Sequence, residues 1–111
     1  METLSQAQLV ERLSEIFPLF RGEWAADTGE VAFPSNSLHS VYQSFLPFVA
    51  TAEATAAQIT KLSALVSSEV AAGGERENAV STCFLEHCGQ VGFARQLSAL
   101  LSAAARSRLH A

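Results

Sequence analysis

Apolar side chains recur along most of this chain at intervals of three and four residues, the spacing that places them on one face of a helix. This pattern predicts about five helices, over approximately 4–17, 38–49, 55–72, 75–89 and 91–108. Short turns separate most of them, so neighbouring helices should run antiparallel. We therefore predict a single all-α domain over 1–111, built as an antiparallel bundle or as a two-hairpin helical stack.

Capping signals support two of the predicted helix starts. Thr3 and Gln6 have the spacing of a capping box, in which each side chain bonds the backbone N–H of the other residue. Thr55 and Gln58 have the same spacing before the third helix. Pro47 should kink the second helix or mark a break in it, because proline has no backbone N–H to donate.

One connection, residues 21–34, shows no sustained period and is longer than the usual ~4–6 residues. It contains the single tryptophan, Trp24, among the carboxylates of Glu23, Asp27 and Glu30. We interpret these four residues as a partner-binding surface, with an aromatic anchor and negative charges that would meet a basic partner. The alternative is that Trp24 packs into the core and the acids are only solvated.

Composition and charge narrow the class of protein. Hydrophobic residues make up 49% of the chain and charged residues 16%, which excludes a disordered chain. The net charge of −4 makes nucleic acid an improbable partner, because phosphate contacts need clustered Lys and Arg. After residue 87 the chain contains three arginines, Arg95, Arg106 and Arg108, and no acidic residue. These arginines could touch an acidic partner, or they could lie in solvent at the end of a helix.

The sequence also carries indications of location. The opening segment, METLSQAQLVERL, lacks the basic and apolar regions of a signal peptide. Residues 31–52 are uncharged, but two prolines and many polar side chains argue against a membrane span. Without a signal peptide, the two cysteines are expected to be free thiols in a reducing cytosol. We expect a cytoplasmic protein that binds no membrane.

The densest group of reactive side chains comprises Cys83, Glu86, His87 and Cys88. A cysteine with a histidine could be a nucleophile with its base, or half of a metal site. On a helix, Cys83 and His87 share a face and Cys88 points elsewhere, and no CxxC, HExxH or GxSxG motif is present. We therefore interpret Cys83 as a small core residue and His87 as partly buried, and expect no enzyme activity, cofactor or metal.

Three segments resemble a family of small bacterial all-helical proteins: IFPLF at 16–20, LHSVYQSFLPFV at 38–49 and ENAVSTCFLEHC at 77–88. Members of that family often lie beside polymorphic toxins and are suspected immunity proteins. The resemblance implies a non-enzymatic domain that binds and blocks a cognate toxin. An acidic surface would suit a basic nuclease toxin. Two alternatives remain: a structural or adaptor domain that self-associates, for which a homodimer is one form, and an enzyme that uses Cys83 and His87.

Overall fold

The computed structural model describes residues 5–28, 38–91 and 94–109, and the regular secondary structure in these ranges is entirely helical. The elements are α1 (Gln6–Ile16), α2 (Phe20–Thr28), α3 (Leu38–Thr51), α4 (Ala56–Ala72), α5 (Gly74–Cys83), the 3-10 helix η1 (Leu85–Val91), α6 (Ala94–Ser98) and α7 (Ala103–Arg106). The predicted all-α class is confirmed.

Reciprocal side-chain caps begin two of the long helices. At α4, the Thr55 hydroxyl accepts from the Gln58 N–H at 3.1 Å and the Gln58 Oε1 accepts from the Thr55 N–H at 2.8 Å, as predicted. At α1, the same box is made by Ser5 and Gln8. The box predicted with Thr3 is therefore wrong by two residues: Ser5 is the N-cap of α1, and Thr3 lies outside the described residues.

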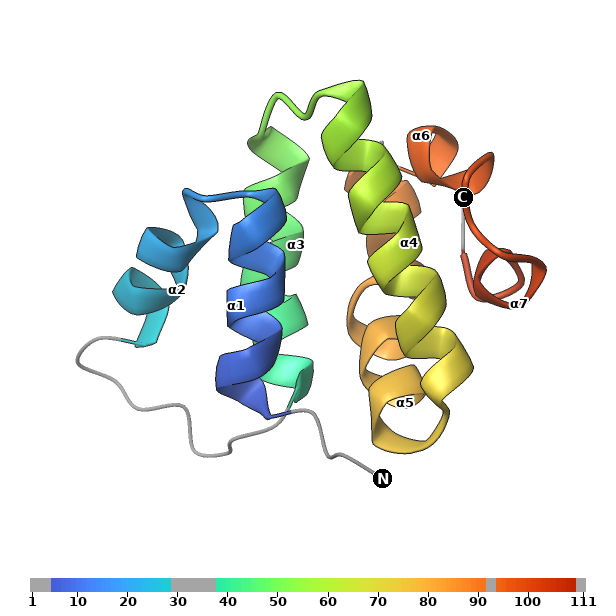
Figure 1. Cartoon of the computed structure of the whole chain (residues 1–111), viewed down its shortest axis with the longest axis horizontal. Helices are drawn as coiled ribbons and strands as arrows, with labels where there is room; N and C mark the ends of the chain where they lie inside the picture. The colour runs from blue at the N-terminus through green and yellow to red at the C-terminus, as the bar shows by residue number, and fades with distance from the viewer. Residues whose placement is uncertain (1–4, 29–37, 92–93, 110–111) are drawn as a thin grey trace.

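The first five helices alternate in direction along the chain (Figure 1). Helix α3 contacts α1, α2 and α5, while α4 contacts α1 and pairs with α5. Gly73 and Gly74 form the tight turn between α4 and α5, with φ of 70° and 59°, a left-handed conformation that glycine adopts without a Cβ clash. The short helices α6 and α7 lie against α4.

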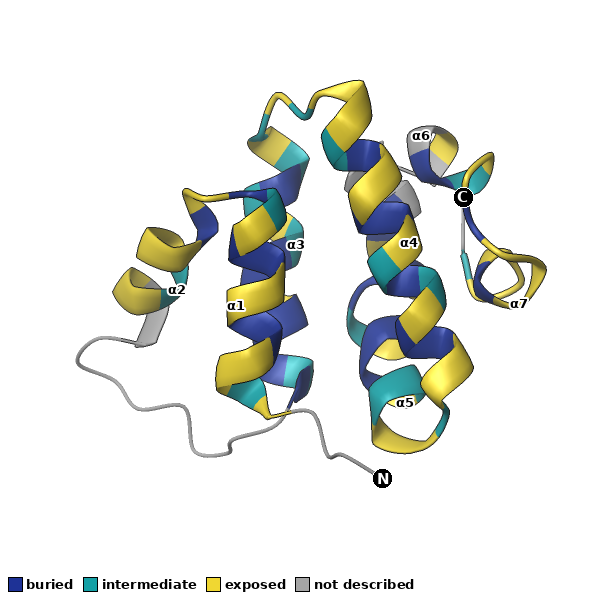
Figure 2. Cartoon of the chain, viewed as in Figure 1, coloured by how far each residue is buried: buried dark blue, intermediate teal, exposed yellow. Residues whose placement is uncertain are grey.

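The core fills the space that these helices enclose, and Figure 2 shows buried residues on their facing sides. Aromatic rings from α2, from α3 and from the residues that directly follow α1 and α5 meet there. Phe45 of α3 has its ring centroid 5.0 Å from that of Phe20 and 5.7 Å from those of Phe17 and Phe84. Because all four side chains are buried, this cluster joins the α1–α2 corner to α3 and to the end of α5.

The expected loop over 21–34 is wrong in its first part, because residues 20–28 form helix α2. Phe20 is fully buried and Trp24, one turn later, is half-buried against the core, whereas the described residues between and after them are exposed. Two apolar anchors in nine residues are too few to show a period in the sequence. Helix α2 packs against α3 and α1. Its own sequence pattern does not predict a helix, and tertiary packing of this kind supplies most of the stability of a helix in a folded protein.

The last two predicted helices are also corrected. The fourth ends at Cys83, because Phe84 leaves helical geometry with φ −127° and ψ −66°, and both Phe84 and the next residue, Leu85, are fully buried. The predicted helix over 91–108 is interrupted between α6 and α7. Arg106 stabilises that interruption by donating to the carbonyls of Ser98 at 2.8 Å and Leu101 at 3.0 Å. Of the kink or break expected at Pro47, the break does not occur, since α3 continues through Pro47 to Thr51.

Candidate functional site

The structure places the predicted partner-binding residues on a helix. Glu23 is exposed in the first turn of α2, and Trp24 packs against the core, as in the alternative interpretation. Asp27 belongs to α2, but its side chain is outside the described part, and Glu30 lies entirely outside the described residues. Of the four, Glu23 is thus the one that the structure shows on the surface.

An apolar pocket lies beside α2, where α1 turns into it. The pocket has a volume of about 360 Å³ and is lined by Phe17, Pro18, Leu19, Phe48, Thr51, Ala52, Glu53 and Gln58. Its residues come from the α1–α2 turn, the end of α3 and the start of α4. Hydrogen bonds from Phe17 N–H to Leu13 O (2.8 Å) and from Phe20 N–H to Phe17 O (2.9 Å) hold the turn. The site is therefore built on the α1–α2 turn, α3, the α3–α4 connection and α4.

Leu19 is the unusual residue of this pocket. Its neighbours Phe17 and Phe20 are buried, while Leu19 is 81% exposed. Among the described residues, Leu100 is the only other exposed large apolar side chain, at 49%. An isolated exposed leucine needs no explanation, but a leucine beside an apolar pocket lined by aromatic rings is typical of an interaction surface.

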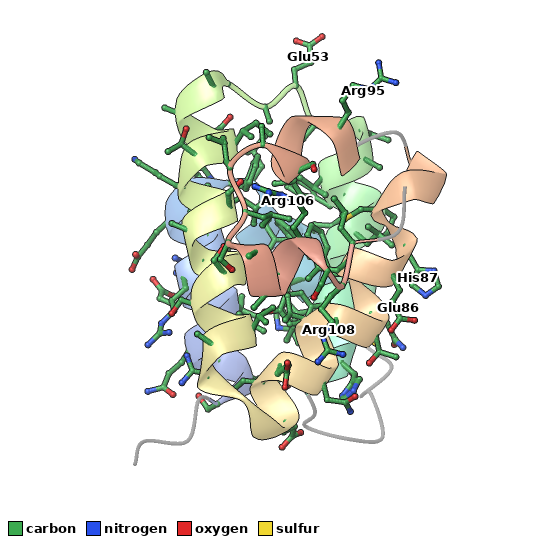
Figure 3. The ribbon with its side chains drawn as sticks, turned by 90° about the vertical axis from the view of Figure 1, so that its right-hand side faces the viewer. Glu53, Glu86, His87, Arg95, Arg106 and Arg108 are labelled. Carbon is green, nitrogen blue, oxygen red and sulfur yellow. The ribbon has the colours of Figure 1, made fainter. Side chains whose placement is uncertain are left out.

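Carboxylates border this surface. Glu53 lines the pocket, and it projects from the α3–α4 connection at the upper edge of Figure 3. Glu23 lies one turn beyond Leu19, because its N–H donates to the Leu19 carbonyl at 3.3 Å. The nearby Arg21 is engaged with Glu11 at 2.8 Å. An apolar centre with an acidic rim follows, and we name Leu19, Phe17, Phe48, Glu53 and Glu23 the corner surface.

Sequence reasoning missed most of the corner surface, because it used the apolar residues only as the buried faces of predicted helices. One signal was available: Pro18 ends the first helix, so Leu19 does not continue the apolar face of that helix. The sequence could not show that residues near 17, 48 and 53 converge. That convergence depends on the packing of α1 against α3 and α4.

The cysteine–histidine group is not assembled. Cys83 is half-buried at the end of α5, where the Gln43 Nε2 donates to its Sγ at 3.9 Å. The prediction of a partly buried His87 is wrong: Glu86 and His87 are exposed on η1 and project outward in Figure 3. Since α5 ends at Cys83, the expected helical face shared with His87 does not form. Cys88 is fully buried in the core.

Burial determines the acidity of both thiols. Desolvation raises the pKa of Cys83 above its usual value, more than the hydrogen bond from Gln43 lowers it. Burial raises the pKa of Cys88 to about 12. Because the thiolate is the nucleophile, neither environment activates a cysteine near neutral pH.

We expect Cys83 to react with a disulfide reagent such as DTNB at pH 7.5 more slowly than free glutathione does. Its raised pKa and half-buried position both reduce the accessible thiolate. The measurement is the labelling rate of the Cys88→Ser variant, in which Cys83 is the remaining thiol, with Cys83→Ser as the matched control. A Cys83 that reacts faster than glutathione would contradict this reading and revive the enzyme hypothesis.

Other sites receive less support from the described residues. No group of three or more His, Cys, Asp or Glu side chains among them could hold a metal ion. No helix in the same part of the chain combines the length and apolar character needed to cross a bilayer. At the C-terminal end, Arg108 pairs with Glu77 at 3.0 Å and Arg106 caps backbone carbonyls, so both act within the fold.

Comparison of the chain with protein-family models, with curated proteins and with solved structures gives no match. The resemblance to immunity proteins and the toxin as a partner therefore remain predictions.

Proposed function

We propose that this chain is a non-enzymatic protein-binding domain that acts as an immunity protein and neutralises a cognate bacterial toxin. The observation that carries the binding role is Leu19, 81% exposed at an apolar pocket lined by the rings of Phe17 and Phe48. The toxin as partner rests on the resemblance of the three sequence segments described above.

The physical chemistry of the corner surface favours a partner with an apolar side chain and a basic flank. Covering an exposed leucine is worth about 1.5–3 kcal/mol, because it removes apolar surface from water. Glu53 and Glu23 place negative charge next to that anchor. Complementary charges accelerate association and orient the partner, so a basic toxin would be attracted to this face.

The Leu19→Asp variant should bind the toxin encoded beside this gene about 10–100-fold more weakly, because it removes the apolar anchor and places a charge there. The measurement is the dissociation constant by calorimetry, together with protection of toxin-expressing cells. Leu100→Asp, at the other exposed leucine, is the matched control and should bind as the native chain does. Equal affinity of Leu19→Asp and native protein would remove the corner surface from the proposal.

Charge reversal separates Glu23 and Glu53, the acids of the corner surface, from Asp27 and Glu30, the other acids of the segment predicted from the sequence. The variant Glu23→Lys with Glu53→Lys should associate more slowly, and salt should slow its association less than it slows that of the native chain, because the attraction that salt screens is lost. Reversal at Asp27 and Glu30 tests the remainder of the predicted acidic segment. If reversal at Asp27 and Glu30 leaves the affinity for the toxin unchanged, the contact is confined to the corner surface.

The same exposed leucine also supports a second candidate, a structural or adaptor domain that self-associates. Two copies could cover their corner surfaces against each other in an isologous contact. Sedimentation of the native chain over a range of concentrations discriminates the two. A dimer that Leu19→Asp dissociates would favour self-association, and a strict monomer would favour a foreign partner.

A further inference from the structure

The pocket of the corner surface has an aromatic wall. Phe48 is half-buried, lines the pocket, and has its ring centroid 6.2 Å from that of Phe17, at an interplanar angle of 85°. The volume of about 360 Å³ lies at the lower end of the ~300–1,000 Å³ range of small-molecule sites, so the pocket accommodates one long side chain of a partner. A flat group that enters it can stack on the Phe48 ring.

The polar side chains of the pocket mainly accept hydrogen bonds. The Thr51 hydroxyl donates its single proton to the Phe48 carbonyl at 3.1 Å, so toward a ligand it can only accept. The Gln58 amide is engaged at both ends, since its Nε2 donates to the Ile16 carbonyl at 3.0 Å and its Oε1 accepts from a backbone N–H at 2.8 Å. Glu53 is an exposed carboxylate with no ion pair within the described residues. This lining favours a ligand that donates.

Two helix ends add negative charge at the pocket. Helices α1 and α3 both end beside it, toward the top of Figure 1, since Phe17 directly follows α1 and Thr51 is the last residue of α3. The C-terminus of a helix carries a partial negative charge, which a nearby cation stabilises. Neither of these two helices has a basic residue in its last turn. Helix α4 brings its positive end to the same place, but a capping box already bonds its first N–H groups.

We propose that this pocket binds the guanidinium group of an arginine side chain that the partner presents. The inference rests on the proposed function, because it names the residue with which the toxin fills the corner surface. The planar guanidinium stacks on the Phe48 ring and donates to the Glu53 carboxylate and to the Thr51 hydroxyl. Arginine suits this lining better than lysine, because it has five donors, is weakly hydrated and stacks on aromatic rings. An apolar neighbour of that arginine covers Leu19.

The test uses a small probe and needs no toxin. The folded chain is titrated with the peptide acetyl-Gly-Arg-Gly amide, and the amide chemical shifts of the pocket residues are followed. We expect saturable binding with a Kd of ~1–10 mM. The same peptide with citrulline keeps the planar end group without the charge, and it should bind at least ~10-fold more weakly. The lysine peptide should bind ~3-fold more weakly than the arginine peptide.

Two variants locate the probe. Glu53→Gln alters an exposed side chain, so it should fold as the native chain does and should weaken binding of the arginine peptide by ~5-fold. Glu23→Gln is the matched control, because Glu23 is an exposed acid of the corner surface that does not line the pocket, and it should leave the affinity unchanged. No saturation at ~20 mM arginine peptide, equal binding of the citrulline or lysine peptide, or native affinity in Glu53→Gln would overturn the assignment.

This titration and the toxin-binding experiment fail separately. If the toxin binds at Leu19 but the arginine peptide does not bind the pocket, the proposed function stands and the assignment of the pocket is overturned. If the arginine peptide binds as expected and the toxin does not bind, the immunity role is wrong and the pocket remains a site for arginine.

Discussion

Replacing Phe45 with alanine should lower the free energy of unfolding by about 3–5 kcal/mol, the range for truncation of a fully buried phenylalanine. The Phe45 ring is 0% exposed and meets the rings of Phe20, Phe17 and Phe84 at 5.0–5.7 Å. Its removal leaves a cavity at the point where the α1–α2 corner, α3 and the end of α5 converge. The surrounding rings belong to different elements, so they cannot easily close that cavity.

The measurement is urea unfolding followed by circular dichroism at neutral pH. Phe48→Ala is the matched control, since Phe48 lies on the same helix but is only half-buried, and it should cost less. A loss below ~1 kcal/mol for Phe45→Ala would show that the core is not organised around this ring. The Phe45→Ala variant should also disturb the corner surface, because Phe17 and Phe48 contact the same ring.

Replacing Arg76 with alanine should be similarly damaging, by about 3–5 kcal/mol, because it leaves the buried carboxylate of Glu69 without its counter-ion. The two side chains are 27% and 1% exposed, so the carboxylate has little access to water. By contrast, Arg21→Ala breaks the exposed pair with Glu11 and should cost at most ~1 kcal/mol. The same unfolding measurement compares the two arginine variants.

A double variant makes the origin of this effect testable. Combining Arg76→Ala with Glu69→Leu removes the unpaired charge, and the double variant should be more stable than Arg76→Ala alone. If the double variant were less stable than the single one, the effect of Arg76 would arise from packing of its side chain.

The sequence predicted most where the apolar pattern is long and the helix start is capped. The α1, α3 and α4 segments have a clear period, and α4 also begins with the predicted capping box, so the class of fold and the main helices were recoverable. Segments whose conformation depends on a few buried contacts were not. Helix α2 is held by Phe20 and Trp24, and the helix break at Phe84 accompanies burial of two consecutive apolar residues.

The candidate site also has a part that the sequence predicted and a part that it did not. Glu23 was predicted from local sequence and is exposed on α2, whereas the loop around it was wrong. Leu19 lies far from Phe48 and Glu53 in the sequence, and no local pattern relates it to them. The pairing of Cys83 with His87 looked plausible on a continuous helix, but it depended on a helix that ends at Cys83.

By itself, the sequence determined the all-α class and the positions of the long helices, because periodicity and capping are local properties of neighbouring residues. The tertiary structure alone decided that residues 20–28 are helical, that Leu19 stands exposed at an apolar pocket, and that Glu69 is buried with Arg76 beside a cleft. These features depend on contacts between residues distant in the chain. Burial, and with it the strength of each charge and apolar contact, exists only once the helices pack.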